Sequence, residues 1–432
     1  MLAGLTRPTG TILNYSRFVF LALLPVLLYQ GGAPADDGSD LAALLVNNTY
    51  PIDFERGDLS GPGADLILQL AGGTQFVALG EEHNNFHIPA ITTALFGALK
   101  EHYGYRYFMT EQDPVIMEIF SSSPTRGNPE KINSLAQRYP MGVTFNSDQE
   151  LQMLADLGRI SDAGEDVIWG CDQGAGVTHT LDQLLQELQD DKAIAAVTAF
   201  RQISAEKEAV RDYSLGHFMA DVGAEEILRL KADVNPAQGS RSEWLLDVLV
   251  NSSRIFDFYR NGQKDLLPGY YENNRFREEH LKDLCLARYR AAAERDATPK
   301  ALMKFGSWHI YTGLSPTRVH TIGDFFSGVA RYNGQGFLSV MFVSRPQDPQ
   351  EEMDNLGFVW PFIRDLDPDE FAIVDLRPFR RYPNRLLVEK EEGEAWVNAH
   401  KESYVRLVYG YDLIFFIGNS KDATFEVVPE AG

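Results

Sequence analysis

The sequence predicts an α/β protein: a mostly parallel central sheet flanked by helices, with a long helical insertion over the carboxyl edge of the sheet. Three observations lead to this prediction. Short apolar runs of strand length end abruptly in polar residues, and a segment with helical spacing lies between the first two runs. Between two later runs, about 120 residues show helical spacing and no convincing strand.

Length and charge narrow the class of protein. A chain of 432 residues is long enough for one large α/β unit with an insertion, or for two domains. With 44% hydrophobic and 23% charged residues, it can bury a large core and lacks the polar bias of disordered chains. The 61 acidic against 39 basic residues give a net charge of −22, which disfavours contact with phosphate backbones and anionic lipid surfaces. We therefore expect no nucleic-acid partner.

The first 35 residues resemble a secretory signal. Arg7 and Arg17 precede an apolar run over residues 18–29, and small residues follow before Asp36. The run is shorter than the roughly 20 residues that a membrane span needs. We expect the segment 1–35 to be cleaved, which implies a secreted or periplasmic protein with no stable membrane span. A retained membrane anchor is the alternative.

The remaining chain divides at two composition changes. Residues 36–177 and 299–432 are predicted to form the two parts of the α/β domain, and residues 178–298 the helical insertion, or cap. Strands are predicted at residues 74–79, 105–110, 166–170, 301–305, 336–343, 371–376 and 411–417. A predicted helix over 88–102 makes the first two strands a parallel pair. Residues 345–369, rich in Pro, Asp and Glu, are expected to be a connecting loop.

Four of these strands end in residues that carry chemistry. Two end in Gly-x-x-His motifs, which finish at His83 and His309, and two others are followed by Glu111 and Asp172. The carboxyl ends of parallel strands meet at one edge of a sheet, so we expect one shared site. Imidazoles beside carboxylates suit a divalent cation or a general base. The alternative is that these groups cap strands and helices, and for Asp172 and Gln173 neither interpretation is favoured.

Other residues are candidates from their position alone. His87 follows His83 by four residues and is expected mainly as a group at a helix N-terminus. The charged segment 272–279 could reach back to the site, although a solvated helix face is the expected role. Cys171 ends a strand, as a nucleophile would, but no flanking motif supports that role. It could also form a disulfide with Cys285, the only other cysteine.

The motifs together resemble a known family. Residues 79–85, a strand that ends in Glu111, and residues 305–309 are similar to the erythromycin esterase/ChaN/TIKI superfamily, whose hallmark is a pair of Gly-x-x-His motifs plus a glutamate on the second strand. The opening motif is most similar to the ChaN type. The segment 168–173, the long insertion and the closing strand resemble the erythromycin-esterase branch, whose opening motif is one residue longer.

The resemblance implies a hydrolase that cleaves an ester, lactone or peptide bond in a small-molecule or peptide substrate. It places four catalytic groups at the centre of the site: Glu81, His83, Glu111 and His309. We expect the substrate to be bound by residues around them: Glu82, His87, Asp172, Gln173 and Arg275. The sequence does not indicate an oligomeric state.

The resemblance leaves the mechanism open. In a metal-dependent version, a divalent ion (Zn, Mn or Co) is held by the two histidines together with Glu81 or Glu111. In a metal-free version, His83 activates water, Glu81 or Glu111 orients the imidazole, and His309 stabilises the oxyanion. The alternative function is a haem- or iron-binding protein, similar to ChaN, without hydrolase activity.

Overall fold

The computed structural model describes residues 39–55, 57–161, 167–209, 219, 222–260, 267–345, 359–381 and 404–429. The predicted signal segment 1–35 lies outside the described residues. Among the described residues, no helix is long and apolar enough to cross a membrane.

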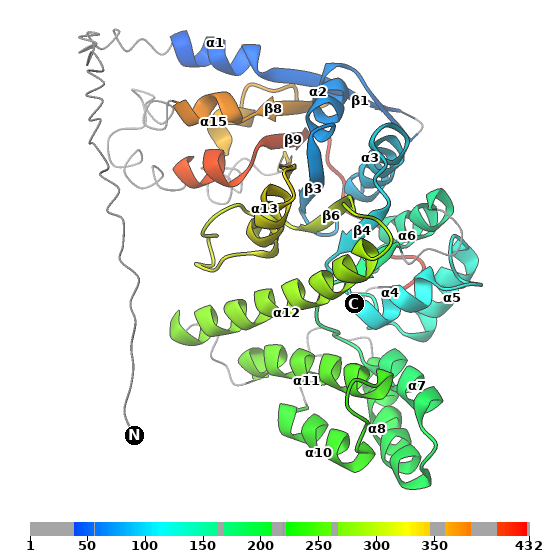
Figure 1. The fold of residues 1–432 in the computed structure, drawn as a ribbon. Helices are drawn as coiled ribbons and strands as arrows, with labels where there is room; N and C mark the ends of the chain where they lie inside the picture. Colours follow the sequence, from blue (N-terminus) through cyan, green and yellow to red (C-terminus); the bar gives the residue numbers. More distant parts are fainter. Residues whose placement is uncertain are drawn as a thin grey trace, which may run out of the picture. The chain divides into compact units, whose positions relative to one another are not determined.

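The described residues form a nine-stranded sheet in the order β2-β1-β8-β9-β7-β3-β6-β4-β5 (Figure 1). Strands β9 through β5 in that order are parallel, and β8, β1 and β2 are antiparallel to their neighbours. The strands are β1 (Thr49–Glu55), β2 (Asp58–Ser60), β3 (Thr74–Glu81), β4 (Tyr107–Thr110), β5 (Ile168–Gly170), β6 (Ala301–Gly306), β7 (Gly336–Ser344), β8 (Phe371–Asp375) and β9 (Leu413–Ile417). The predicted fold class, a mostly parallel sheet flanked by helices, is confirmed.

The central strands are apolar along their whole length because both faces of the sheet are covered. In β3, Val77 and Leu79 pack into one core, whereas Phe76 and Ala78 pack into the core on the opposite face. Every residue of β3 is buried. A continuous apolar run, rather than an alternating one, is the pattern expected for such a strand.

Helices from both parts of the chain cover the sheet. The first core is built with α2 (Pro62–Ala71), α3 (Ile88–Tyr103), α4 (Pro114–Ser121), α5 (Pro129–Arg138) and α6 (Asp148–Ile160). The second core is built with α12 (Leu267–Ala293), α13 (Ile322–Tyr332), α15 (Trp360–Ile363) and the turns η3 (Ser307–Ile310) and η4 (Arg377–Arg381). A further helix, α1 (Ser39–Asn47), precedes β1.

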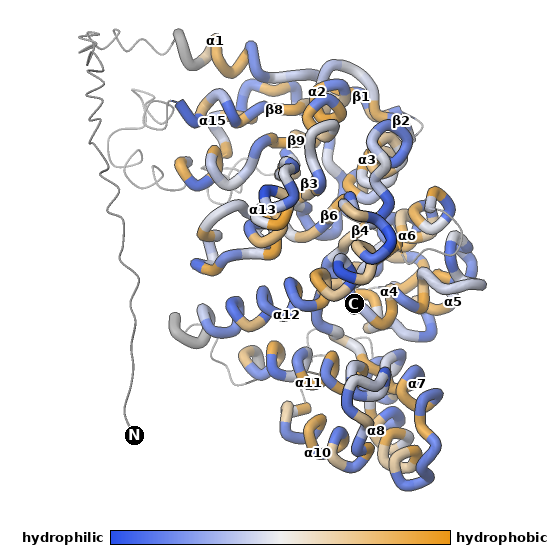
Figure 2. The backbone as a smooth tube through the Cα atoms, in the orientation of Figure 1, coloured by the Kyte–Doolittle hydropathy of each residue, from blue (hydrophilic) through white to orange (hydrophobic). Residues whose placement is uncertain are grey.

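The segment predicted as the insertion is helical over most of its described length. It contains α7 (Thr178–Glu187), α8 (Asp191–Ala209), α10 (Ala224–Val234), α11 (Arg241–Arg260) and α12. Apolar and polar residues interleave along α7, α8, α10 and α11 (Figure 2), and their apolar residues form a third core. Helix α12 runs between these helices and the sheet (Figure 1).

Two features of the fold differ from the sequence prediction. Strands β1 and β2 form an antiparallel hairpin at the sheet edge that the strand prediction missed. Three of the first four residues of β1 are exposed or half-buried, so this strand lacks a continuous apolar run. The predicted loop 345–369 contains the short helix α15, whose Phe362 and Ile363 are buried in the second core.

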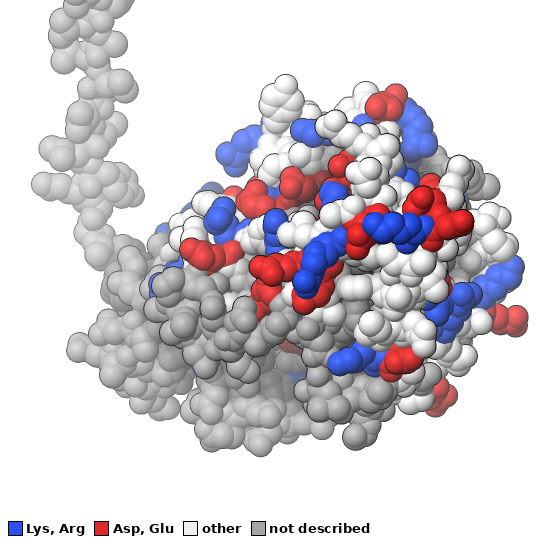
Figure 3. Space-filling view, turned by 90° about the horizontal axis from the view of Figure 1, so that it is seen from below, with Lys and Arg blue, Asp and Glu red and all other residues white. Residues whose placement is uncertain are grey.

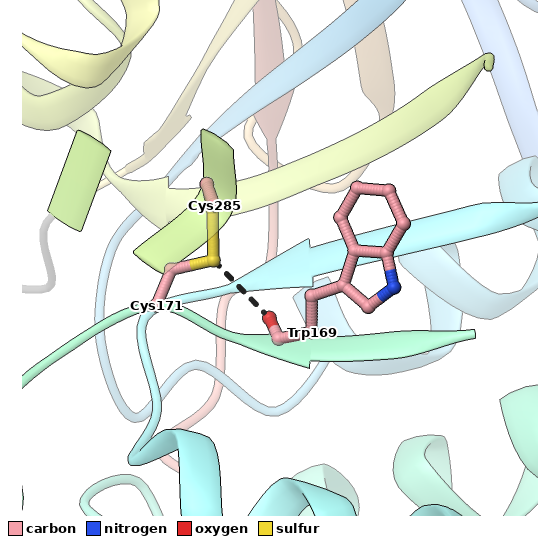
Figure 4. Close-up of a disulfide and its surroundings, with 3 residues drawn as sticks. All are labelled: Trp169, Cys171 and Cys285. Atoms are coloured by element: carbon pink, nitrogen blue, oxygen red, sulfur yellow. Dashed lines mark hydrogen bonds between the residues drawn. A yellow bond between two sulfur atoms is a disulfide. The ribbon is translucent and has the colours of Figure 1, made fainter. Parts of the chain in front are cut away.

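A disulfide joins the end of β5 to helix α12 (Figure 4). Cys171 and Cys285 are 114 positions apart in sequence, and their Cα atoms are 5.6 Å apart. The Sγ atom of Cys171 lies 3.5 Å from the carbonyl oxygen of Trp169. Because its sulfur is in this bond, Cys171 is not available as a nucleophile.

The described surface carries both signs of charge. On the face shown in Figure 3, Lys and Arg side chains are interspersed with Asp and Glu rather than gathered in one patch. On this face the described Lys and Arg side chains form no continuous basic stripe of the kind that contacts a nucleic-acid backbone.

Candidate active site

The two Gly-x-x-His motifs pack directly against each other at the carboxyl ends of β3 and β6. These neighbouring parallel strands pair Glu81 with Gly306. A β-carbon on Gly80 would lie 2.9 Å from the Cα of Ser307. A β-carbon on Gly306 would lie 3.0 Å from Nε2 of His83. Each glycine therefore leaves space for the other motif, which is the physical reason for its presence.

His83 is held from one side by Glu81. Its Nδ1 lies 3.3 Å from Oε1 of Glu81. The ring of His83 stacks on Phe145 with 4.0 Å between the ring centroids. The side chain is 39% exposed, so solvent and a substrate can reach it.

His309 forms a hydrogen bond with a carboxylate from the insertion. Its Nδ1 lies 2.6 Å from Oε1 of Glu278, which stands on α12. The other oxygen of Glu278 accepts a hydrogen bond from the backbone N–H of Ile322 at 2.8 Å. The His309 side chain is 14% exposed, so this pair is more enclosed than the pair of His83 and Glu81.

Glu111 lies between the two imidazoles. Its Oε1 is 3.4 Å from Nε2 of His309. Its Oε2 accepts a 2.6 Å hydrogen bond from the backbone N–H of Gly306. The same oxygen would be 3.3 Å from a β-carbon on Gly306, the position that also lies against Nε2 of His83. The structure thus places His83, His309, Glu81 and Glu111 close together at the ends of β3, β4 and β6.

Arg277 on α12 neutralises the buried carboxylates. Its Nη2 donates to Oε1 of Glu111 and to Oδ2 of Asp172, each at 2.6 Å. Its Nε donates to Oδ1 of Asp172 at 3.1 Å and to Oε1 of Gln173 at 2.9 Å. One guanidinium thus joins the ends of β4 and β5 to the insertion.

The surrounding charges shift the ionisation of these groups. Burial lowers the pKa of His83, but Glu81 and Glu111 outweigh it, so the pKa lies above its ordinary value. Burial also opposes the charged form of His309, and Glu111 and Glu278 likewise raise its pKa. Burial raises the pKa of Glu111, but His309 and Arg277 reverse this and hold it well below its usual range. Glu111 is therefore an anion that favours protonated imidazoles on both sides.

Two of the predicted substrate-binding residues lie away from Glu111. Both oxygens of Glu82 accept from the backbone N–H of Ser344 at 3.0 Å, at the end of β7. His87 precedes α3, and its ring packs against Phe371 of β8, three strands from β3 in the sheet order. Burial lowers the pKa of His87. Its position matches the helix N-terminal role that was the expected one.

Helix α12 differs from the expectation of a solvated face. Within the segment 272–279, Arg275 is exposed, whereas Arg277 and Glu278 turn inward and complete the site. Asp172 is fully buried and paired with Arg277, and Gln173 accepts from the same guanidinium. The sequence singles out the segment 272–279 as able to reach the site, but the residue named from it is Arg275 and not Arg277 or Glu278, because no strand end or motif distinguishes them. The signal that could have found them is the adjacent basic and acidic pair at 277–278 within this charged segment.

The donor atoms around Glu111 do not fit a divalent metal. Both oxygens of Glu111 already accept from N–H donors, and Oε2 of Glu81 is 2.5 Å from Nζ of Lys304. In the part of the chain that the structure describes, no cluster of three or more His, Cys, Asp or Glu side chains is arranged to hold a metal ion. We therefore derive no step through a metal, and metal dependence stays a prediction.

Comparisons with known proteins add information about the fold. No family model matches the chain, and no curated protein matches it. Among solved structures, the chain is similar to a succinoglycan biosynthesis protein, with 13% identity, a TM-score of 0.54, and coverage of 91% of this chain and 99% of that one. A Bacillus cereus protein matches with 10% identity and a TM-score of 0.51, over 90% of this chain and 99% of that one.

A third similar structure is a mutant of the erythromycin esterase EreC in its open conformation. It matches with 11% identity and a TM-score of 0.52, over 83% of this chain and 94% of that one. The similarity covers most of the chain, and the identity is low enough that it concerns the fold alone. The fold that the paired motifs implied is thus confirmed, because this chain folds as an erythromycin esterase does.

Proposed function

We propose that this protein is an exported hydrolase that cleaves an ester, lactone or peptide bond with water activated by His83. The observation that carries the proposal is the arrangement of two imidazoles on either side of Glu111. The Nδ1 atom of each imidazole faces a separate carboxylate, at 3.3 Å for His83 and at 2.6 Å for His309. Hydrolysis of a carbonyl compound needs a general base, which a carboxylate can orient, and a hydrogen-bond donor for the carbonyl oxygen.

In the proposed reaction the two histidines have different roles. Nε2 of His83 accepts a proton from water while the water oxygen forms a bond to the carbonyl carbon. His309, protonated, donates a hydrogen bond to the carbonyl oxygen as negative charge develops there. The bond from carbon to the leaving oxygen or nitrogen then breaks, and the leaving group takes the proton from His83.

The difference in exposure supports this assignment of roles. His83 is the more exposed of the two, at 39%, and can meet water, whereas His309 is more enclosed, at 14%. The 3.4 Å contact of His309 Nε2 with Glu111 is longer than a good hydrogen bond, which leaves that nitrogen able to donate to a substrate. Glu111 favours the protonated form of His309 that this step needs.

Two observations support export. The first is the signal-like segment over residues 1–35. The second is the disulfide between Cys171 and Cys285, because such bonds persist in oxidising compartments and are rare in the cytosol. Intact-mass analysis of protein from the native host tests the proposal, and a mature chain that still begins at Met1 would contradict it.

The test of activity is a panel of ester, lactone and peptide substrates with single and double variants. We expect His83→Ala and His309→Ala each to lower kcat/KM by roughly a thousandfold or more, and the double variant to cost little more than either single one. His102→Ala, an exposed histidine on α3, is the matched control and should retain activity. Additive and partial losses would contradict a shared site.

The same preparation tests the alternatives. Metal analysis and activity after chelation decide whether a divalent ion is needed. A Soret absorption band in the purified protein would favour the haem-binding alternative. Protein that shows this band and hydrolyses none of the panel would overturn the proposed function.

A further inference from the structure

A lysine lies in the middle of the sheet, directly beneath the candidate site. Lys304 is the fourth residue of β6, and its side chain is fully buried. Its Nζ is 2.5 Å from Oε2 of Glu81 and 3.0 Å from Oε2 of Glu150, which stands on α6. Both carboxylates are themselves almost completely buried.

Burying one ammonium and two carboxylates together costs free energy, so we expect a role that accounts for it. Removing an ammonium or a carboxylate from water costs several kcal/mol per ion, and replacing buried ion pairs by apolar residues is often neutral or stabilising. The neighbour two positions earlier on the same face, Leu302, is part of the first apolar core. A leucine or methionine at position 304 would continue that core, so packing alone does not account for the lysine.

The strand register explains what the lysine reaches. In the pairing of β3 with β6, Leu79 lies opposite Lys304 and Glu81 lies opposite Gly306. The Lys304 side chain therefore extends along the sheet toward the end of β3, where Glu81 stands two residues before His83. The ion pair between Lys304 and Glu81 thus connects the first Gly-x-x-His motif to the interior of β6.

Lys304 determines which oxygen of Glu81 is available to His83. The ammonium binds Oε2, and Oε1 faces Nδ1 of His83 at 3.3 Å. That Oε1 atom is buried and accepts no well-aligned hydrogen bond from the described residues. The ion pair with Lys304 is therefore the contact that keeps the carboxylate plane turned in this direction.

We propose that Lys304, supported by Glu150, is a positioning residue that keeps Glu81 charged and turned toward His83. Glu81 then holds the proton of the neutral imidazole on Nδ1 and leaves Nε2 free to act as the base. The inference deepens the proposed function, on which its catalytic meaning rests, but the imidazole tautomer can be measured without any substrate.

The electrostatics of the cluster agree with this role. Burial lowers the pKa of Lys304, but Glu150 and Glu81 outweigh it and raise the pKa to about 12. Burial raises the pKa of Glu81, and Lys304 and His83 reverse the effect, so Glu81 stays ionised. Burial raises the pKa of Glu150 to about 7. Of the two carboxylates that bind Lys304, the one that takes up a proton more readily is thus Glu150, whereas Glu81, which faces His83, stays charged.

The experiment uses nitrogen-15 NMR of the histidine rings, which distinguishes a proton on Nδ1 from one on Nε2. The spectra are recorded above the pKa of His83, with its signal assigned by His83→Asn. In the wild type we expect the Nδ1–H tautomer. In Lys304→Met we expect a shift toward the Nε2–H form, together with a fall in kcat of roughly 10- to 100-fold and little change in KM.

A second variant separates positioning from folding. Lys304→Met leaves two buried carboxylates without a cation, which can destabilise the protein, whereas Lys304→Met combined with Glu150→Leu removes one of them. We expect the double variant to recover a melting temperature near that of the wild type and to keep the altered tautomer and the low kcat. Lys282→Met is the control, because Lys282 is also buried but binds Glu279 and the carbonyl of His320 instead.

The outcomes are decisive in both directions. An unchanged Nδ1–H signal in the folded double variant would overturn the inference, even if activity fell. A changed tautomer in the variants of a protein whose wild type hydrolyses no substrate would support the positioning role and contradict the proposed function. A change of equal size in Lys282→Met would show a general structural effect and overturn the inference.

Discussion

The two halves of the candidate site use the same chemistry but are built differently. The half around His83 is made from the sheet and its covering helix, with Glu81, Lys304 and Glu150 all buried. The half around His309 depends on the insertion, since Glu278 and Arg277 both stand on α12. The comparison shows that the sheet and its covering helix supply one oriented histidine, whereas the second requires a helix that is remote in sequence from the first motif.

The largest effect is expected from removing the Arg277 guanidinium in the half around His309. Arg277→Met should lower activity at least a thousandfold and destabilise the protein by about 3–5 kcal/mol, because it leaves Glu111 and Asp172 buried without their cation. Arg290→Met, at an exposed position on the same helix α12, is the matched control. Chemical denaturation and the substrate panel measure both quantities. Equal effects of the two substitutions would show that the guanidinium at position 277 has no special role.

A smaller effect is expected where the two halves touch. Gly306→Ala places a methyl group 3.0 Å from Nε2 of His83 and 3.3 Å from Oε2 of Glu111, which is tighter than ordinary contact. We expect activity to fall by roughly 10- to 100-fold, because the methyl group would displace the His83 ring and the Glu111 carboxylate from their positions. The loss of stability should be modest. Gly97→Ala on α3, where a β-carbon meets nothing within 4 Å, should preserve activity and raise the melting temperature slightly. Full activity in Gly306→Ala would contradict the close approach of the two motifs.

The pH dependence of the rate distinguishes the two histidines. The reaction needs His83 neutral and His309 protonated, and the pKa of each is raised. The value of kcat/KM should therefore rise with pH through a midpoint above 6.5 and fall again at higher pH. A midpoint clearly below 6.5 in the acidic limb would contradict the role of His83 as the base.

The smallest effect concerns stability. Because the folded pKa of His309 is raised, its contacts stabilise the protein fully below the unfolded value of about 6.5 and lose this contribution as pH rises through the folded pKa. The difference in unfolding free energy between the wild type and His309→Asn should therefore be largest in mild acid and shrink above neutrality. Denaturation curves at several pH values measure it, and a difference that grows with pH would be the wrong sign.

Much of the fold and half of the site could be predicted from the sequence. Apolar runs that end in polar groups located seven strands, since buried parallel strands leave this pattern along the chain. The paired motifs located His83 and His309 for the same reason. The hairpin of β1 and β2 and the charges on α12 could not be found in this way, because their partners are set by tertiary contacts. Lys304 does leave a signal, a single cation inside an apolar run, but that signal does not show which carboxylates the lysine meets.

The disulfide links completion of the candidate site to the stage at which the chain is synthesised and oxidised. Cys171 lies one residue before Asp172, and Cys285 lies on α12 seven residues after Glu278, so the bond ties the end of β5 to the helix that completes the His309 half. The bond closes a loop of 114 positions. In the chain-entropy model, this closure lowers the conformational entropy of the unfolded chain and stabilises the folded protein by about 4–5 kcal/mol. The bond can form only after the chain has been synthesised through Cys285, near the end of the insertion, and has met an oxidant. A chain retained in a reducing compartment would therefore have its first histidine in place and lack the covalent link that fixes the second half.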